Sequence, residues 1–173
     1  MANVVLIGMP GCGKSTVGVL LAKLLGMDFM DTDVVFQARE GQKLQPMIDK
    51  IGIEAFLKKE EDVILGIECD RTVIATGGSA VYGKRAMEHL HHHGIVVYIR
   101  LPFSEIERRL SNLATRGVAL KKNQTLHDLY EERIPLYEAE ADIVFDATGF
   151  EIEKTVAALA EHLDALNGAT HGC

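Results

Sequence analysis

An eight-residue segment near the start of the chain constrains the fold most: Gly8-Met9-Pro10-Gly11-Cys12-Gly13-Lys14-Ser15. It fits the pattern G-x-x-x-x-G-K-[ST] at every fixed position. The apolar run from Asn3 to Gly8 indicates a strand buried on both faces, and residues 16–25 have a helical pattern. Because a phosphate-binding loop forms between such a strand and helix, the predicted ligands are a nucleoside triphosphate and Mg²⁺.

The residue types of this loop match the chemistry of a phosphate. Glycines let backbone N–H groups turn inward around an anion, and the next helix directs its positive end at the same place. Lys14 is expected to reach the β- and γ-phosphate oxygens, and the Ser15 hydroxyl to join the Mg²⁺ shell. Cys12 is interpreted as a small filler residue, with an oxidation-sensitive thiol as the alternative. The predicted nucleotide-binding residues here are Gly11, Cys12, Gly13, Lys14, Ser15 and Thr16.

The rest of the chain has the pattern of an α/β protein. Its 173 residues, 47% apolar and 25% charged, favour one domain over residues 1–167 and a disordered tail over residues 168–173. Further apolar runs at residues 72–76, 95–101 and 141–145 alternate with helical patterns. Such alternation predicts a three-layer α/β/α fold around a parallel sheet.

Charge and cysteine content exclude several classes of partner. The formal net charge is −7, and residues 138–173, with eight acids and one base, account for all of it. No basic nucleic-acid-binding surface is therefore expected. Three scattered cysteines indicate reduced thiols in the cytoplasm. The sequence shows no signal peptide or apolar run of membrane-spanning length, so we expect no membrane partner. We also expect a monomer.

The absence of other motifs narrows the type of nucleotide enzyme. Switch GTPases carry an Asn-Lys-x-Asp motif and transport ATPases a Leu-Ser-Gly-Gly motif, and the sequence contains neither. The short chain therefore favours a small kinase, which passes a phosphoryl group to an acceptor molecule.

Two carboxylates and two glycines are candidates for the acceptor side. Of Asp31 and Asp33, one is expected to hold metal-bound water and the other to orient an attacking hydroxyl. A helix N-cap at Asp33 is the alternative. Gly77 and Gly78 follow the strand at residues 72–76 and would offer backbone N–H groups at the carboxyl edge of the sheet, or form a plain turn.

Basic residues in the second half of the chain are candidates for binding anions. Residues 105–122 hold five bases and two acids. We interpret residues 111–124 as a mobile lid that places Arg116 on the transferring phosphoryl group. Arg109 is a second candidate for the triphosphate, and Arg133, on a predicted helix, for a substrate anion. A solvated surface is the alternative for each.

Taken in order, these motifs resemble those of the shikimate kinases, within the nucleoside-monophosphate-kinase-like group, over residues 3 to about 162. After the phosphate loop, the resemblance is carried by Asp31-Thr32-Asp33, Phe56-Leu-Lys-Lys-Glu60, Thr76-Gly-Gly-Ser79, Arg116 and Arg133-Ile-Pro-Leu-Tyr137. It implies a five-stranded parallel sheet in the order 2-3-1-4-5 with a mobile lid. It also implies Mg²⁺-dependent transfer of the γ-phosphoryl group of ATP to shikimate, a step of aromatic amino acid biosynthesis.

The resemblance implies a role for each matching residue. Lys14, Asp33 and Arg116 would be catalytic, with Asp33 binding and orienting the acceptor hydroxyls. Asp31 would lie near Mg²⁺ through water, beside Ser15. The remaining implied contacts are Gly77 and Gly78 with the acceptor through backbone donors, Arg109 beside adenine, Arg116 on the phosphates, and Arg133 on the acceptor carboxylate.

The sequence departs from the family pattern at three places. Leu57 stands where Phe-Arg-x-x-Glu has a second carboxylate-binding arginine, Ser79 replaces the third glycine of Gly-Gly-Gly, and Gly117-Val118 replaces Pro-Leu. A hydrogen bond to a charged group contributes roughly 1.5–3 kcal/mol, so a carboxylate acceptor should bind about 10- to 100-fold more weakly. Lys58 is a candidate replacement, turned about 100° around a helix. Two alternatives stay open: a kinase for another hydroxylated metabolite, and a non-catalytic ATP-binding protein.

Overall fold

The computed structural model describes residues 2–111 and 118–170 of the chain. Strands and helices alternate along most of the described chain. The elements are β1 (Asn3–Ile7), α1 (Lys14–Leu25), β2 (Asp28–Asp31), α2 (Thr32–Glu40), α3 (Leu44–Ile51), α4 (Ile53–Leu65), β3 (Thr72–Ala75), the 3₁₀ turn η1 (Ala80–Tyr82), α5 (Lys84–His93), β4 (Gly94–Arg100), α6 (Phe103–Ser111), α7 (Leu126–Glu140), β5 (Ile143–Asp146) and α8 (Ile152–Thr170).

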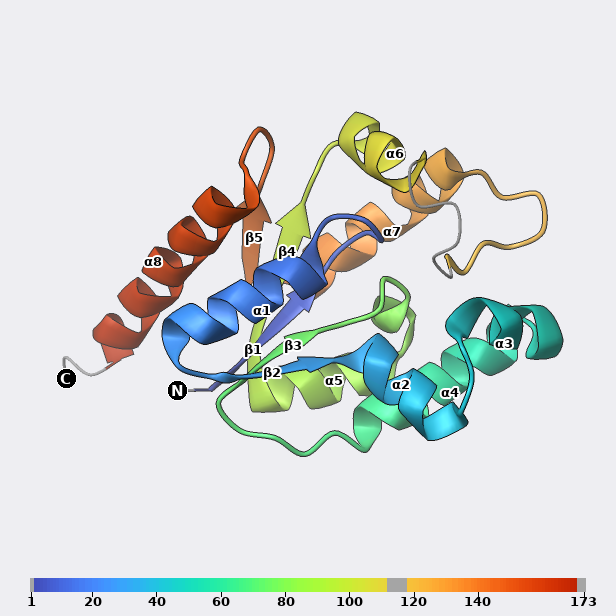
Figure 1. Cartoon of the computed structure of the whole chain (residues 1–173), viewed down its shortest axis with the longest axis horizontal. Coiled ribbons are helices and arrows are strands. Elements are labelled where there is room, and N and C mark those ends of the chain that lie inside the picture. Colours follow the sequence, from blue (N-terminus) through green and yellow to red (C-terminus); the bar gives the residue numbers. More distant parts are fainter. Residues whose placement is uncertain (1, 112–117, 171–173) are drawn as a thin grey trace.

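The strands form one five-stranded parallel sheet in the order β2-β3-β1-β4-β5, which confirms the predicted fold class and strand order (Figure 1). β1 is the central strand, and Val5 pairs with Ile74 of β3 and with Val96 of β4. All five residues of β1 are buried, as a continuous apolar run predicts for a strand covered on both faces.

Helices cover both faces of this sheet (Figure 1). α1 and α8 lie side by side on one face, and α5 packs against β4 on the other. The main core between the layers is aliphatic and includes Leu6, Leu21, Val97 and Leu159. Because all strands are parallel, the segments that follow β1, β2 and β3 meet at one edge of the sheet, where ligands bind in open α/β folds.

A second, smaller hydrophobic cluster joins α2, α3 and α4 at one end of the molecule. Its centre is the pair Phe36 and Phe56, whose ring centroids lie 5.1 Å apart. Ala119, from the segment before α7, is buried in the same cluster. This contact anchors the described end of the predicted lid to the α2–α4 region.

Asp31 caps the start of helix α2. The Asp31 carboxylate accepts hydrogen bonds from the backbone N–H groups of Asp33 and Val34, and α2 therefore starts at Thr32. The N-cap alternative considered for Asp33 is thus wrong for that residue, because Asp31 is the cap.

The C-terminal segment is helical further along the chain than the predicted tail allows. α8 continues to Thr170, so helix extends into the predicted tail at residues 168–173, since no proline interrupts this run. Residues 112–117 of the predicted lid lie outside the described residues, and residues 118–124 form neither helix nor strand. No helix in the described ranges has the length and apolar character needed to cross a membrane.

Candidate active site

The phosphate loop between β1 and α1 has a backbone that only glycine adopts readily. Gly8, Gly11 and Gly13 have φ values of 143°, 81° and 101°. A Cβ at Gly8 would also lie only 2.8 Å from the carbonyl oxygen of Ile99. The glycines of the motif therefore give the loop its tight curvature, and the N-terminus of α1 follows directly. This geometry fits a polyphosphate.

Lys14 is buried, and its ammonium group is fixed within the loop. Nζ donates hydrogen bonds to the carbonyl oxygens of Gly8, at 2.7 Å, and Met9, at 3.0 Å. The Cys12 sulfur lies 3.8 Å from the same nitrogen, and Cys12 is buried. The loop thus holds one positive charge close to its own backbone.

Ser15 and Asp31 bring two oxygen ligands together across 16 residues of sequence. Ser15 Oγ donates to Asp31 Oδ2 at 2.6 Å, while Oδ1 of the same carboxylate caps α2. Hydroxyl and carboxylate oxygens are the donors that Mg²⁺ prefers, and the helix cap fixes the orientation of this carboxylate. The pair therefore fits the predicted magnesium site.

Asp33 and Glu60 both approach the Cα of Gly77. A Cβ at Gly77 would lie 2.6 Å from Asp33 Oδ1 and 2.5 Å from Glu60 Oε1. By the sum of these distances, the two carboxylate oxygens are within about 5 Å of each other. Burial, together with the Asp31 carboxylate, raises the pKa of Asp33 from 3.8 to about 6, while Lys14 partly opposes the shift. A carboxylate titrating near neutral pH suits proton acceptance from a hydroxyl.

Glu60 is a part of this site to which sequence reasoning gave no role. Its carboxylate is buried on α4 and accepts a 2.7 Å hydrogen bond from Ser79 Oγ. Burial raises the pKa of Glu60 from 4.5 to about 7, against the effect of the Ser79 hydrogen bond. The available signal was its helical spacing, because Glu60 shares a face of α4 with the buried residues Phe56 and Val63.

Arg133 is almost fully buried behind Gly78, at 1% exposed. A Cβ on Gly78 would lie 3.0 Å from Arg133 Nη1 and 2.8 Å from Cδ of Pro10 in the phosphate loop. Tyr137 Oη donates to the Gly78 carbonyl at 2.6 Å. Gly78 is therefore held between the phosphate loop and the predicted anion-binding arginine.

The backbone N–H groups of Gly77 and Gly78, both predicted to donate to the acceptor, have different surroundings in this structure. The Gly77 N–H already donates to Thr32 Oγ1 at 3.1 Å, so that donor is occupied within the protein. What Gly77 contributes is the absence of a side chain between two carboxylates, and Gly78 remains the predicted backbone donor.

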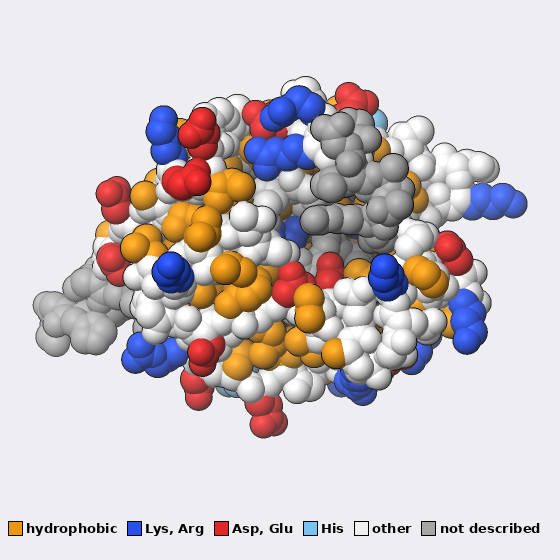
Figure 2. All heavy atoms as spheres, viewed as in Figure 1, with side chains coloured by type: hydrophobic (Ala, Val, Ile, Leu, Met, Phe, Trp, Pro, Cys, Tyr) orange, Lys and Arg blue, Asp and Glu red, His pale blue; other side chains and the backbone are white. Residues whose placement is uncertain are grey.

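One cleft of about 840 Å³ brings most of the predicted residues together. Figure 2 shows it as a hollow on one face of the molecule, beside which acidic and basic side chains meet. The cleft is lined by residues of the phosphate loop and by Asp31, Asp33, Gly78, Arg109 and Val118. Arg109 Nη1 also contacts the carbonyl oxygen of Cys12 at 3.3 Å. Gly77 and Arg133 lie behind this surface, and Arg116 lies outside the described residues.

The position of the missing arginine is part of the second hydrophobic cluster. Leu57 is partly buried and packs against this cluster, which contains Phe36 and Phe56. Lys58 is exposed, and Lys59 pairs with Glu40 at 2.7 Å. Neither lysine occupies the face of α4 that carries Glu60. In the described chain, Arg133 is thus left as the predicted contact for an acceptor carboxylate.

Comparisons with known proteins agree with this geometry. A model of the shikimate kinase family matches residues 10–164. The shikimate kinase of Thermodesulfovibrio yellowstonii is 35% identical over 174 residues, which cover 98% of this chain and 100% of the relative. That of Haemophilus influenzae is 34% identical, with 96% and 94% covered.

Solved structures of shikimate kinases are also similar to this chain. A shikimate kinase from Acinetobacter baumannii in complex with shikimate has a TM-score of 0.84 and 30% identity, with 100% of this chain and 96% of the other covered. Shikimate kinase from Aquifex aeolicus has a TM-score of 0.77 and 31% identity, with 99% of each chain covered. The likeness therefore extends over the whole fold described above.

Proposed function

Because the chain belongs to the shikimate kinase family, we infer that it transfers the γ-phosphoryl group of ATP to a hydroxyl of shikimate, giving shikimate 3-phosphate and ADP. The observation that carries this function is that one cleft is lined both by the phosphate loop and by Asp33 and Gly78. A nucleotide and an acceptor bound there would meet between Lys14 and Asp33.

The nucleotide side provides positive charge and backbone donors. The loop N–H groups and the α1 N-terminus would hold the β- and γ-phosphates, with Lys14 neutralising their charge. Mg²⁺ would be held by Ser15 and, through water, by Asp31. When bound, this ion supplies charge neutralisation at the phosphate oxygens. Arg109 would lie beside adenine, and Arg116 would add a guanidinium to the transferring group.

The acceptor side aligns the attacking alcohol. Asp33 accepts a hydrogen bond from the reacting hydroxyl and takes its proton as the new oxygen–phosphorus bond forms. The bond between the γ-phosphorus and the β,γ-bridging oxygen breaks, and the electron pair leaves with ADP. Asp33 then returns the proton to solvent. Phosphoryl transfer is direct, so no phosphorylated enzyme is formed.

Arg133 would bind the carboxylate of the acceptor, with Gly78 as a backbone donor. A kinase for a less anionic hydroxylated metabolite is the second candidate, because Leu57 stands at the position of the second carboxylate-binding arginine. We also propose a cytoplasmic monomer. The unpaired cysteines Cys12 and Cys69 agree with the reducing compartment that this assumes.

Coupled ADP release with shikimate and a panel of other hydroxylated metabolites distinguishes these functions. Saturable turnover with shikimate supports the first. Turnover with another compound alone supports the second. ATP binding without turnover on any acceptor would indicate a non-catalytic nucleotide-binding protein and overturn both.

A further inference from the structure

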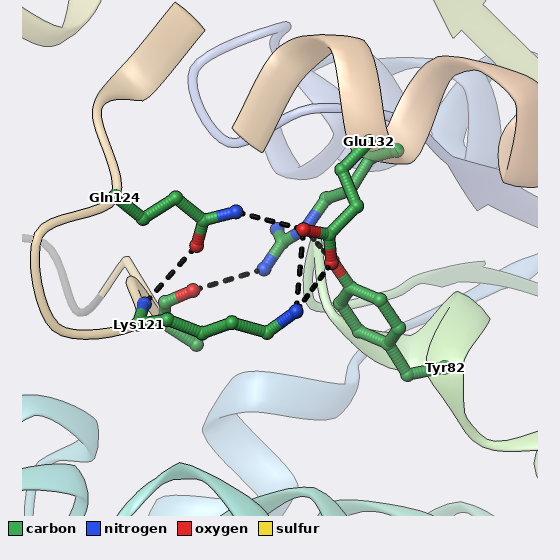
Figure 3. Close-up of polar contacts among 6 residues, drawn as sticks. Tyr82, Lys121, Gln124 and Glu132 are labelled. Atoms are coloured by element: carbon green, nitrogen blue, oxygen red, sulfur yellow. Dashed lines mark hydrogen bonds and ion pairs between the residues drawn. The ribbon is translucent and has the colours of Figure 1, made fainter. Parts of the chain in front are cut away.

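Glu132 receives hydrogen bonds from two segments far apart in the sequence (Figure 3). Tyr82 Oη, from η1, donates to Oε1 at 2.6 Å. Lys121 Nζ lies 3.0 Å from Oε1 and 3.2 Å from Oε2, and Gln124 Nε2 donates to Oε2 at 2.8 Å. One carboxylate on α7 therefore ties η1 to the segment that precedes α7.

The same tyrosine holds Arg133, the next residue along α7. Arg133 Nε donates to Tyr82 Oη at 3.4 Å, and the guanidinium carbon lies 5.2 Å from the centre of the tyrosine ring. Nη2 donates to the carbonyl oxygen of Ala119 at 3.3 Å. Nη1 faces the Gly78 side, where an added Cβ would come within 3.0 Å of it. Protein groups thus hold Nε and Nη2 of the guanidinium, while Nη1 lies on the side of Gly78.

These contacts form a chain of hydrogen bonds in which Arg133 donates to Tyr82 and Tyr82 donates to Glu132. The Glu132 carboxylate accepts a hydrogen bond from the Tyr82 hydroxyl, which makes the tyrosine oxygen a better acceptor for Arg133 Nε–H. Hydrogen bonds from Tyr82 and Lys121 hold the pKa of Glu132 below its usual value, so this carboxylate is ionised at neutral pH. Lys121 is largely exposed, so its ion pair alone contributes little. The short bond from Tyr82 is the stronger element.

The orientation of Arg133 matters more in this chain than in one with two acceptor arginines. Leu57 cannot bind the acceptor carboxylate alongside Arg133. The planar guanidinium of Arg133 therefore has to direct its N–H groups at that carboxylate by itself. An arginine free to rotate would lose part of its binding energy to ordering when the acceptor binds.

We propose that Glu132 is a positioning residue: acting through Tyr82, it orients the Arg133 guanidinium toward the acceptor and ties that orientation to residues 119–124. This inference rests on the proposed function, in which Arg133 binds the acceptor carboxylate.

Two conservative substitutions and their combination test the proposal. Tyr82→Phe removes one hydroxyl and keeps the ring, and Glu132→Gln removes the charge and keeps the shape. Each should raise the KM for shikimate by about 5- to 30-fold, with the KM for ATP changed by less than about twofold. The double variant should be no worse than the poorer single variant, because both act through one relay. Glu131→Gln, at an exposed neighbour on α7, is the control and should match the wild type.

Three results would overturn the positioning role. The first is an unchanged KM for shikimate in both single variants. The second is an additive double variant. The third is a parallel loss of ATP affinity and melting temperature, which a merely structural role predicts.

A measurement without acceptor separates this proposal from the function on which it rests. The Arg133 Nε–H resonance, assigned by its loss in Arg133→Lys, should exchange with solvent several-fold faster in Tyr82→Phe and in Glu132→Gln. Equal exchange in all three proteins would refute the relay. If the wild type fails to phosphorylate shikimate, the proposed function falls, and this exchange still decides whether Glu132 orients Arg133.

Discussion

Ser79 Oγ donates a 2.7 Å hydrogen bond to Oε2 of Glu60, and both side chains are buried. Ser79 stands at the third glycine of the family pattern, and Leu57, three residues before Glu60, stands at an arginine. The serine hydroxyl thus provides this glutamate with a neutral hydrogen-bond donor that a glycine would lack. Because burial favours the uncharged form of a carboxyl group, we expect pH to act on this site through Glu60.

Replacing Glu60 by glutamine should remove a pH-dependent cost of folding. Its pKa rises from 4.5 to about 7 on burial, so the folded chain binds this proton more tightly than the unfolded chain. The contribution of protonated Glu60 to the free energy of unfolding is fully present below about pH 4.5. It is lost as the pH rises through about 7, where the folded protein loses this proton. From pH 5 to pH 8, Glu60→Gln should therefore gain about 1–3 kcal/mol in unfolding free energy relative to the wild type.

Chemical denaturation of the ligand-free protein at both pH values measures this difference. Asp62→Asn, at an exposed position on the same helix, should follow the wild type. Parallel pH dependence of the wild type and Glu60→Gln would show that Glu60 is ionised at little cost.

Asp33→Asn should abolish most turnover and leave nucleotide binding intact. Asparagine is nearly isosteric but accepts no proton, so kcat should fall by about 10²- to 10⁴-fold. Because burial and Asp31 raise the pKa of Asp33 to about 6, wild-type kcat/KM should rise with pH through about 6 as the carboxylate forms. Steady-state kinetics and ATP titration check both points. A fall in ATP affinity with unchanged kcat would place Asp33 on the metal side instead.

Gly77→Ala should damage the acceptor side alone. The new methyl group would lie 2.5 Å from Glu60 Oε1 and 2.6 Å from Asp33 Oδ1, so at least one carboxylate has to move. We expect kcat/KM for the acceptor to fall at least about tenfold, since a displacement near 1 Å costs that much or more in an aligned site. The KM for ATP should stay the same. Wild-type kinetics for the acceptor would mean that this alignment does not limit the reaction.

Leu57→Arg should restore a second contact for a carboxylate acceptor. A charged hydrogen bond contributes roughly 1.5–3 kcal/mol, so the KM for shikimate should fall by about tenfold or more. Leu57 packs against the second cluster, so some loss of stability is expected as well. Kinetics with shikimate and thermal unfolding measure the two effects. An unchanged KM in a folded variant would show that the pocket departs from the family at other positions too.

The sequence predicted the parts of the site that lie in continuous segments. The phosphate loop has a fixed spacing, and Asp31 and Asp33 lie at the end of a strand and just after it, at the same edge of the sheet. The hydrophobic pattern predicted a parallel sheet, but the strand order came from family resemblance. Hydrophobic periodicity does not specify which strands are neighbours.

The sequence pattern did not predict the contacts between residues that lie far apart in the chain. Glu60 meets Ser79 across 19 residues, and Tyr82 meets Glu132 across 50. Each of these side chains is an ordinary polar residue of a helix or turn until the fold brings its partner near. Their roles depend on burial and direction, which a linear pattern does not contain.

In the proposed reaction, this cleft transfers a phosphoryl group from ATP to an alcohol aligned by Asp33. Its most direct test is ³¹P NMR of wild-type protein incubated with Mg²⁺, ATP and shikimate. We expect a phosphomonoester of shikimate and ADP to form in equal amounts, and Asp33→Asn to form almost none of either. ADP accompanied by inorganic phosphate alone, or a phosphomonoester formed equally well by Asp33→Asn, would contradict it.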